Sequence, residues 1–137
     1  MPSGSCICGK LKYEFKGDPQ GLALCYCFSC QKITGSTHTT NVLIPENEFS
    51  VTTGSEKTNT QTHETGMKLT LHFCGDCGGT IYKTADNEAF AGMAVVQVGT
   101  IDHPNLLQEA KPAVELFTKY RAPWIPKLDG AVQKAEF

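Results

Sequence analysis

The sequence lacks clustered basic residues, long apolar runs and a basic start followed by an apolar stretch. Its 12 Lys and Arg are scattered among 14 Asp and Glu, which gives a formal charge of -2. Because a phosphate backbone is tracked by clustered Lys and Arg, we expect no nucleic-acid partner. A membrane span needs about 20 apolar residues, so we expect no membrane association. Since no secretion signal is evident at its start, we expect the protein in the cytoplasm.

Helix signals are scarce as well. Only short turns at 45–48 and 104–107 show a helical pattern. Apolar and polar residues alternate with a period of two in 11–15, and Leu69, Leu71 and Phe73 share one face of 68–73, so we predict both segments to be strands. Further strands are predicted at 41–44, 49–52, 80–83 and 89–98. The polar, Thr-rich segment 55–66 suits an exposed edge strand or a loop. A chain of 137 residues has the usual size of one domain, so we predict a single domain, 1–137, of mainly β class.

Cysteine, in contrast, is abundant, with seven residues in close groups. Cytoplasmic thiols stay reduced and an odd count fits a disulfide framework poorly, so these groups favour metal binding. Two pairs, Cys6 with Cys8 and Cys74 with Cys77, are each followed by a glycine that permits a tight turn. We predict that these four thiolates hold one structural zinc ion. Structural zinc contributes about 10–16 kcal/mol in finger peptides, which exceeds the ~3–4 kcal/mol of entropy for closing the long loop between the pairs.

The remaining cysteines, Cys25, Cys27 and Cys30, lie within six residues of one another. Three protein ligands on a tetrahedral zinc ion leave one position for water or substrate. We therefore predict a second, open zinc site whose three cysteines carry the catalysis, and thiol chemistry is the favoured hypothesis. Two alternatives stay open: a histidine such as His38 or His72 completes a second structural site, or the cysteines exchange between the sites.

Residues around the open site are candidates for substrate binding. The turn Thr34-Gly35-Ser36 offers amide and hydroxyl donors for an oxyanion, or is an ordinary hydrogen-bonded turn. Lys32 and Arg121 are candidate partners for a substrate carboxylate. In the tail after Pro112, which we expect to wrap the body in an extended course, Trp124 is predicted to fill the core. We expect His63 and His103 on the surface.

The cysteine motifs resemble those of the glutathione-dependent formaldehyde-activating enzyme family, whose relatives include centromere protein V. The resemblance covers nearly the whole chain. It rests on four runs: GSCICG at 4–9, CYCFSCQKITGS at 25–36, HFCGDCG at 72–78 and ELFTKYRAPW at 115–124. Many relatives carry histidine at the position of Tyr26, where this chain departs from the pattern.

The resemblance implies a compact all-β fold of small stacked sheets with few or no helices. It also implies a zinc-binding domain with the same two zinc ions, one at Cys6, Cys8, Cys74 and Cys77 and one at Cys25, Cys27 and Cys30. The founding enzymes condense formaldehyde with glutathione to S-hydroxymethylglutathione, which is formally a carbon-sulfur lyase reaction run in reverse.

The favoured function is therefore a zinc-dependent carbon-sulfur lyase or synthase that acts on a small thiol adduct, with glutathione or a similar thiol as partner. One alternative is a zinc hydrolase or lyase that acts on a specialised metabolite through a bound water. Another is a zinc-stabilised binding module without catalysis, in which Phe28, Tyr120 and Trp124 form a protein-contact surface.

Overall fold

The computed structural model describes the backbone of residues 1–137 and the side chains of all of them except Gln20. Its strands are β1 (Ser3–Ser5), β2 (Lys12–Phe15), β3 (Gln20–Cys25), β4 (Thr39–Pro45), β5 (Phe49–Thr53), β6 (Glu56–Thr62), β7 (Lys68–Cys74), β8 (Thr80–Ala85), β9 (Met93–Gln97), β10 (Val114–Leu116) and β11 (Val132–Gln133). The helices are α1 (Phe28–Thr34), α2 (Leu106–Glu109) and the 3-10 turns η1 (Glu46–Glu48), η2 (Val98–Thr100) and η3 (Thr118–Tyr120). Among the described residues no helix has the length and apolar character needed to cross a bilayer.

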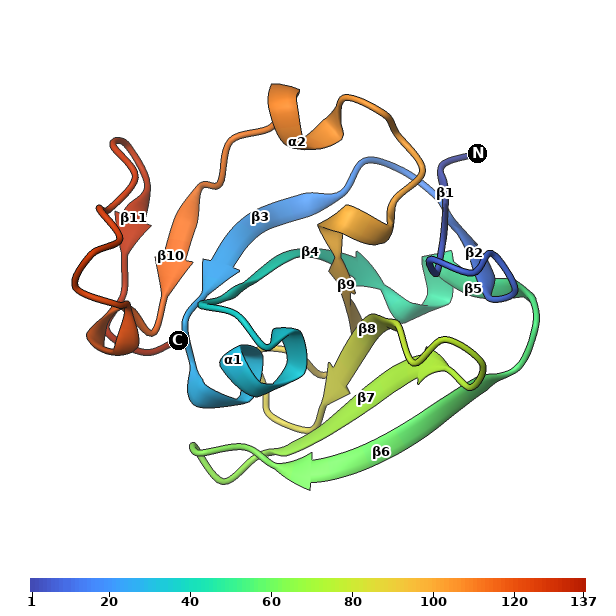
Figure 1. Ribbon diagram of the computed structural model, residues 1–137, viewed down its shortest axis with the longest axis horizontal. Helices are drawn as coiled ribbons and strands as arrows, with labels where there is room; N and C mark the ends of the chain where they lie inside the picture. The colour runs from blue at the N-terminus through green and yellow to red at the C-terminus, as the bar shows by residue number, and fades with distance from the viewer.

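The strands form two sheets (Figure 1). A small sheet has the order β1-β2-β5, and a large one has the order β11-β10-β3-β4-β9-β8-β7-β6. Pairing is antiparallel except at β10, which runs parallel to both β3 and β11. The predicted all-β class with few helices is confirmed, and the Thr-rich segment forms β6 at the edge of the large sheet.

Two elements near the cysteines differ from the sequence prediction. Strand β3 was not predicted, because its residues Gly-Leu-Ala-Leu-Cys do not alternate between polar and apolar. Helix α1 was also missed, because it has seven residues and a cysteine at its N-cap in place of the usual Ser, Asp or Asn. The Cys30 N–H donates to the Cys27 thiol at this cap, and Gly35 ends the helix with a left-handed φ of 61°.

The two faces of the large sheet have different surroundings. On one face, Val42, Ile44 and Val96 pack against Tyr13 and Phe15 of the small sheet in the main hydrophobic core. Side chains alternate between faces along a strand, so Asn41 and its alternate neighbours on β4 point the other way. That second face carries the Cys25–Cys30 segment and its own smaller cluster of buried residues: Leu24, Cys25, Tyr26, Cys27, Cys30 and Phe117.

The C-terminal tail runs along β10 in the extended course that its composition predicts, and it returns to the three-cysteine segment (Figure 1). Backbone hydrogen bonds hold it: Lys134 N–H donates to Glu115 O at 2.9 Å, and Phe117 N–H donates to Glu136 O at 3.2 Å. The prediction that Trp124 fills the core is wrong, because its side chain is 75% exposed. Phe117, buried at the start of η3, fills that role instead.

Candidate metal and substrate site

Four cysteines meet where the loop between β1 and β2 approaches the turn between β7 and β8. The Cys6 and Cys8 sulfurs are 3.5 Å apart, and the Cys8 and Cys74 sulfurs are 3.7 Å apart. With Cys77 included, all four sulfurs lie within 4.8 Å of one another. A tetrahedral zinc ion with bonds of about 2.3 Å to sulfur holds its ligands about 3.8 Å apart. The four thiols therefore fit a closed zinc site.

Backbone N–H groups support these thiols as anions. The Leu11 N–H donates to Cys6 Sγ at 3.3 Å, and the Asp76 N–H donates to Cys74 Sγ at 3.4 Å. The turns that aim them need glycine, since Gly9 and Gly78 have φ values of 78° and 75°. A thiolate that accepts such bonds is stabilised relative to the thiol, which is the form that a metal binds.

The other three cysteines converge around the start of α1. Cys25 is the last residue of β3, Cys27 is the N-cap of α1 and Cys30 lies in its first turn. All three are buried free thiols, and their sulfurs lie within 4.8 Å of one another. These distances and this soft donor set also fit a zinc ion, with three ligands from the chain.

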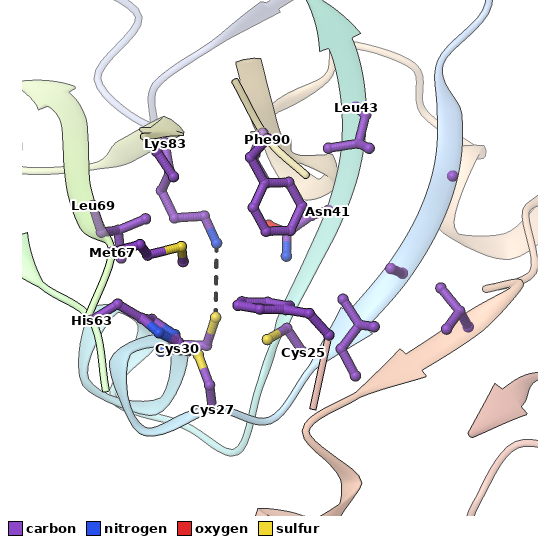
Figure 2. A pocket seen from close by; sticks show the side chains of 17 residues that line it. Cys25, Cys27, Cys30, Asn41, Leu43, His63, Met67, Leu69, Lys83 and Phe90 are labelled. Carbon is purple, nitrogen blue, oxygen red and sulfur yellow. Dashed lines mark hydrogen bonds between the residues drawn. The ribbon is translucent and has the colours of Figure 1, made fainter. Parts of the chain in front are cut away.

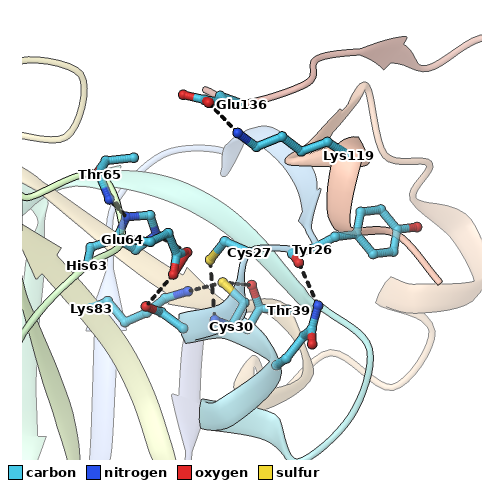
Figure 3. Close-up of polar contacts among 12 residues, drawn as sticks. Tyr26, Cys27, Cys30, Thr39, His63, Glu64, Thr65, Lys83, Lys119 and Glu136 are labelled. Carbon is cyan, nitrogen blue, oxygen red and sulfur yellow. Dashed lines mark hydrogen bonds and ion pairs between the residues drawn. The ribbon is translucent and has the colours of Figure 1, made fainter.

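A chain of polar groups leads from Cys30 into the large sheet (Figure 3). Thr39 Oγ1 donates to Cys30 Sγ at 3.0 Å and accepts from Asn41 Nδ2 at 2.7 Å. On the other side, Lys83 Nζ lies 3.8 Å from Cys30 Sγ, and the lysine is only 4% exposed. Hydrogen bonds from the thiols of Cys25 and Cys27, together with Lys83 and Thr39, hold the pKa of Cys30 well below its usual value, although burial opposes the shift. Cys30 is therefore the thiol that ionises first in this cluster.

The three-cysteine cluster faces a cavity of about 200 Å³ (Figure 2). Its floor is the second face of the large sheet, where Asn41 of β4 and Lys83 of β8 are its polar groups besides the cysteines and His63. The other walls are apolar side chains, of which the larger are Leu43, Leu69, Met67, Phe90, Val95 and Phe137. The sulfur cluster thus opens onto a space of small-molecule size.

His63, which we predicted on the surface, lies beside this cavity and is only 3% exposed. The tight turn between β6 and β7 places it there, because His63 N–H donates to Met67 O at 2.8 Å. The Thr65 N–H donates to His63 Nδ1 at 3.1 Å, which puts the ring proton on Nε2, 2.9 Å from Glu64 Oε1. Burial lowers the pKa of His63, so the ring is neutral at pH 7. The potential ligand atoms of His63, Glu64 and Cys27 lie within 4.8 Å of one another.

The two histidines proposed as alternative zinc ligands have other partners. His72 stacks on Tyr82 with ring centroids 4.0 Å apart, and its Nε2 lies 2.9 Å from Thr84 Oγ1. His38 packs on Tyr26, and its Nδ1 lies 2.8 Å from Thr37 Oγ1. Neither belongs to a ligand group with the three cysteines among the described residues. His63 is the histidine that the fold brings to this cluster.

The family model for the glutathione-dependent formaldehyde-activating enzyme matches residues 1–120. The chain belongs to this family. Membership assigns it at family level to glutathione-related formaldehyde activation. A search of curated proteins finds no match. Among solved structures, the crystal structure of a Rhodobacter sphaeroides protein, a structural genomics target, matches with a TM-score of 0.59 and 19% identity, covering 79% of this chain and 96% of that one. That likeness supports the fold.

Tyr26, between the first two cysteines of the three-cysteine cluster, is joined to the tail. Its hydroxyl donates to Glu115 Oε1 at 2.7 Å, and the Arg121 guanidinium lies over its ring at 5.7 Å. Arg121 also donates to Glu115 Oε2 at 3.2 Å. Burial raises the pKa of Glu115, but hydrogen bonds from Tyr26, Gln133 and the Leu128 N–H outweigh burial, so that the net shift of this pKa is downward. Tyr26 is thus a structural link between the three-cysteine segment and β10.

The predicted substrate-binding residues lie outside the cavity. Thr34, Gly35 and Ser36 form the exposed C-terminal end of α1, where Thr34 Oγ1 donates to Cys30 O at 3.0 Å and accepts from Ser36 N–H at 3.1 Å. Arg121 is engaged by Glu115. Lys32 lines a second hollow of about 400 Å³ between α1 and the β6–β7 pair, which shares Leu69 with the cavity. Their roles with substrate stay predictions.

Proposed function

We propose that the protein is a cytoplasmic, two-zinc enzyme that makes or breaks a carbon-sulfur bond in a small thiol adduct such as S-hydroxymethylglutathione. One zinc ion would be structural, held by Cys6, Cys8, Cys74 and Cys77. The other would be held by Cys25, Cys27 and Cys30. The observation that carries the proposal is that these last three sulfurs face a cavity while the other four do not line it. The seven free cysteines support a reducing compartment, where glutathione is present.

Zinc bound at the three cysteines would hold a thiol as its thiolate and so supply a nucleophile at neutral pH. In the addition, the thiol sulfur forms a bond to the carbonyl carbon and the C=O electron pair moves to the oxygen, which takes the proton released by the thiol. Lys83 is the buried cation beside Cys30 and is the donor placed to stabilise charge on that oxygen. The apolar walls exclude water, which strengthens this interaction.

The peptide part of glutathione would bind outside the cavity. Its charged ends do not match apolar walls, because a buried charge without a partner is costly. The second hollow offers charged partners of both signs, Lys32 and Glu64, together with Ser29 and Gln61. We place the peptide part of the thiol there, with its sulfur reaching the cavity past Leu69. Lys32 would then bind a carboxylate. Thr34, Gly35 and Ser36, at the exposed end of α1, and Arg121, on the tail, stay candidate contacts for the parts of the thiol that extend beyond this hollow.

The test is an exchange measurement, because formaldehyde and glutathione also combine without an enzyme. Two-dimensional exchange NMR with ¹³C-formaldehyde measures how fast S-hydroxymethylglutathione forms and breaks at equilibrium. The zinc-loaded protein should accelerate exchange, Cys27→Ser should abolish the acceleration, and Leu107→Ala on the exposed face of α2 should keep it. Exchange no faster than the spontaneous rate at micromolar protein would overturn the proposal.

A further inference from the structure

The cavity is larger and more apolar than formaldehyde requires. One water molecule occupies about 30 Å³ of the liquid and formaldehyde is little larger, whereas the cavity holds about 200 Å³. Its apolar lining includes Leu43, Val95 and Ala85 of the sheet and the rings of Phe90 and Phe137. Figure 2 shows Leu43 and Phe90 beside the cavity. The two rings meet edge to face with centroids 5.1 Å apart. Such walls favour an apolar group, because each buried methylene is stabilised by leaving water.

Asn41 has an acceptor that lacks a partner. The side chain is 7% exposed, and its Nδ2 donates to Thr39 Oγ1, whose own proton goes to Cys30 Sγ. This sequence of bonds fixes which end of the amide is oxygen. Asn41 Oδ1 then accepts no hydrogen bond from any described residue. A buried acceptor without a donor costs free energy, so a ligand with a hydrogen-bond donor would suit this site.

Lys83, in contrast, needs a ligand atom that accepts a hydrogen bond. Its ammonium is a donor at the same face of the sheet, and Val95 is its direct cross-strand neighbour, which is in turn paired with Leu43. A ligand oxygen between Lys83 and Asn41 must therefore accept from one and donate to the other. A carboxylate or a ketone has no proton to donate. The hydroxyl of a thiohemiacetal, R–CH(OH)–S–R', meets both needs, and the carbon that bears it also bears the sulfur.

We propose that the preferred carbonyl substrate is an aldehyde with an apolar chain of several carbons, whose thiohemiacetal hydroxyl lies between Lys83 and Asn41 and whose chain packs against Val95 and Phe90. This inference rests on the carbon-sulfur chemistry proposed above. The reaction is balanced: the thiol adds across the carbonyl, a C–S bond forms, the C=O electron pair moves to oxygen, and the thiol proton ends on that oxygen. No oxidant or reductant is needed.

The first experiment measures kcat/KM with glutathione for formaldehyde, acetaldehyde, propanal, butanal and pentanal, each divided by its uncatalysed rate constant. The enhancement should rise from acetaldehyde to pentanal by up to about fourfold per methylene. In Val95→Phe and Ala85→Leu, which fill the apolar end, the ratio of pentanal to acetaldehyde should fall at least tenfold. Leu107→Phe on exposed α2 is the matched control and should leave the ratio unchanged. Two cavity variants are used so that a folding defect in one leaves the other informative.

The second experiment needs no turnover. Saturation-transfer NMR with 1-pentanol, which has an apolar chain and a hydroxyl that donates and accepts, should show binding to the wild-type protein and weaker binding to Asn41→Leu and Val95→Phe. Acceleration with formaldehyde but a flat or falling enhancement along the series, with no pentanol binding, overturns this inference and leaves the proposed function intact. No acceleration with any aldehyde, formaldehyde included, overturns both.

Discussion

Replacing Lys83 by methionine should weaken zinc binding at the three cysteines while sparing the four-cysteine site. Three thiolates and one zinc ion carry a net charge of -1, and the Lys83 ammonium, 3.8 Å from Cys30 Sγ, balances it. At an effective dielectric of about 20, two unit charges at this distance attract by about 4 kcal/mol. That energy corresponds to roughly three decades in affinity, and structural relaxation reduces it, so we expect a loss of about 10²–10³-fold.

A second lysine provides a matched control. Lys10 Nζ also lies 3.8 Å from an anionic atom, Asp76 Oδ1, close to the four-cysteine site, but its side chain is 67% exposed. Exposed pairs of this kind contribute about 0–1 kcal/mol. Lys10→Met should therefore change zinc affinity less than about fivefold. The two variants separate the effect of burial from the effect of distance.

The assay is a competition titration with a chromogenic zinc chelator, which resolves the two ions of each molecule by affinity. The tight ion at the four-cysteine site serves as an internal reference. Chemical denaturation of the metal-free protein completes the test, because it shows whether Lys83→Met is folded under the conditions of the titration. Equal loss of both ions, or an affinity change no larger than that of Lys10→Met, would refute the electrostatic argument.

Three further predictions concern stability and the division of roles. Cys77→Ser should lose one zinc ion and unfold or aggregate, whereas Cys27→Ser should lose one zinc ion and activity with a modest loss of stability; metal counting with thermal melts checks this, and equal destabilisation would contradict it. Glu115→Gln should cost about 2–4 kcal/mol in urea unfolding at pH 7. Because the folded pKa of Glu115 is lowered, that difference should hold above about pH 5 and shrink as the pH falls through the folded pKa; a difference that grew in acid would exclude this cause. Trp124→Ala should change the free energy of unfolding by less than about 0.5 kcal/mol, and a larger loss would mean that the exposed ring has a partner.

Short-range features could be predicted from the sequence. The spacing within each cysteine group sets where its sulfurs point, so the three-cysteine cluster follows from residues a few positions apart, and the four-cysteine cluster follows from matching two similar pairs across the chain. Alternation identified β2 and β7, since each of these strands turns one face to a core, and strand-forming residue types indicated β4, β5, β8 and β9. Helix α1 escaped notice because its signals are a thiol cap and a single glycine.

Apart from the meeting of the two cysteine pairs, long-range features could not be predicted. Asn41, His63 and Lys83 meet at Cys30 and Cys27 only because β4, β7, β8 and β9 pair in one particular register, which no local pattern fixes. The sequence did contain one indication that Lys83 has a role in the site. Lys83 is a charged residue that directly follows two buried residues, Ile81 and Tyr82, within the same strand. Trp124 shows the opposite case: a large aromatic ring between proline-rich turns suggested the core, but the tail is held by backbone hydrogen bonds along β10 and leaves the ring outside.

The two faces of the large sheet have separate roles, since one face packs in the main core and the other lines the cavity. On β4, Val42 and Ile44 contact the small sheet, whereas Asn41 and Leu43 line the cavity. A substitution at an alternate position therefore alters either folding or ligand choice, with little crossover between the two. Relatives built on this scaffold can diverge in what they recognise through a handful of positions on one side, while the opposite side preserves a common body.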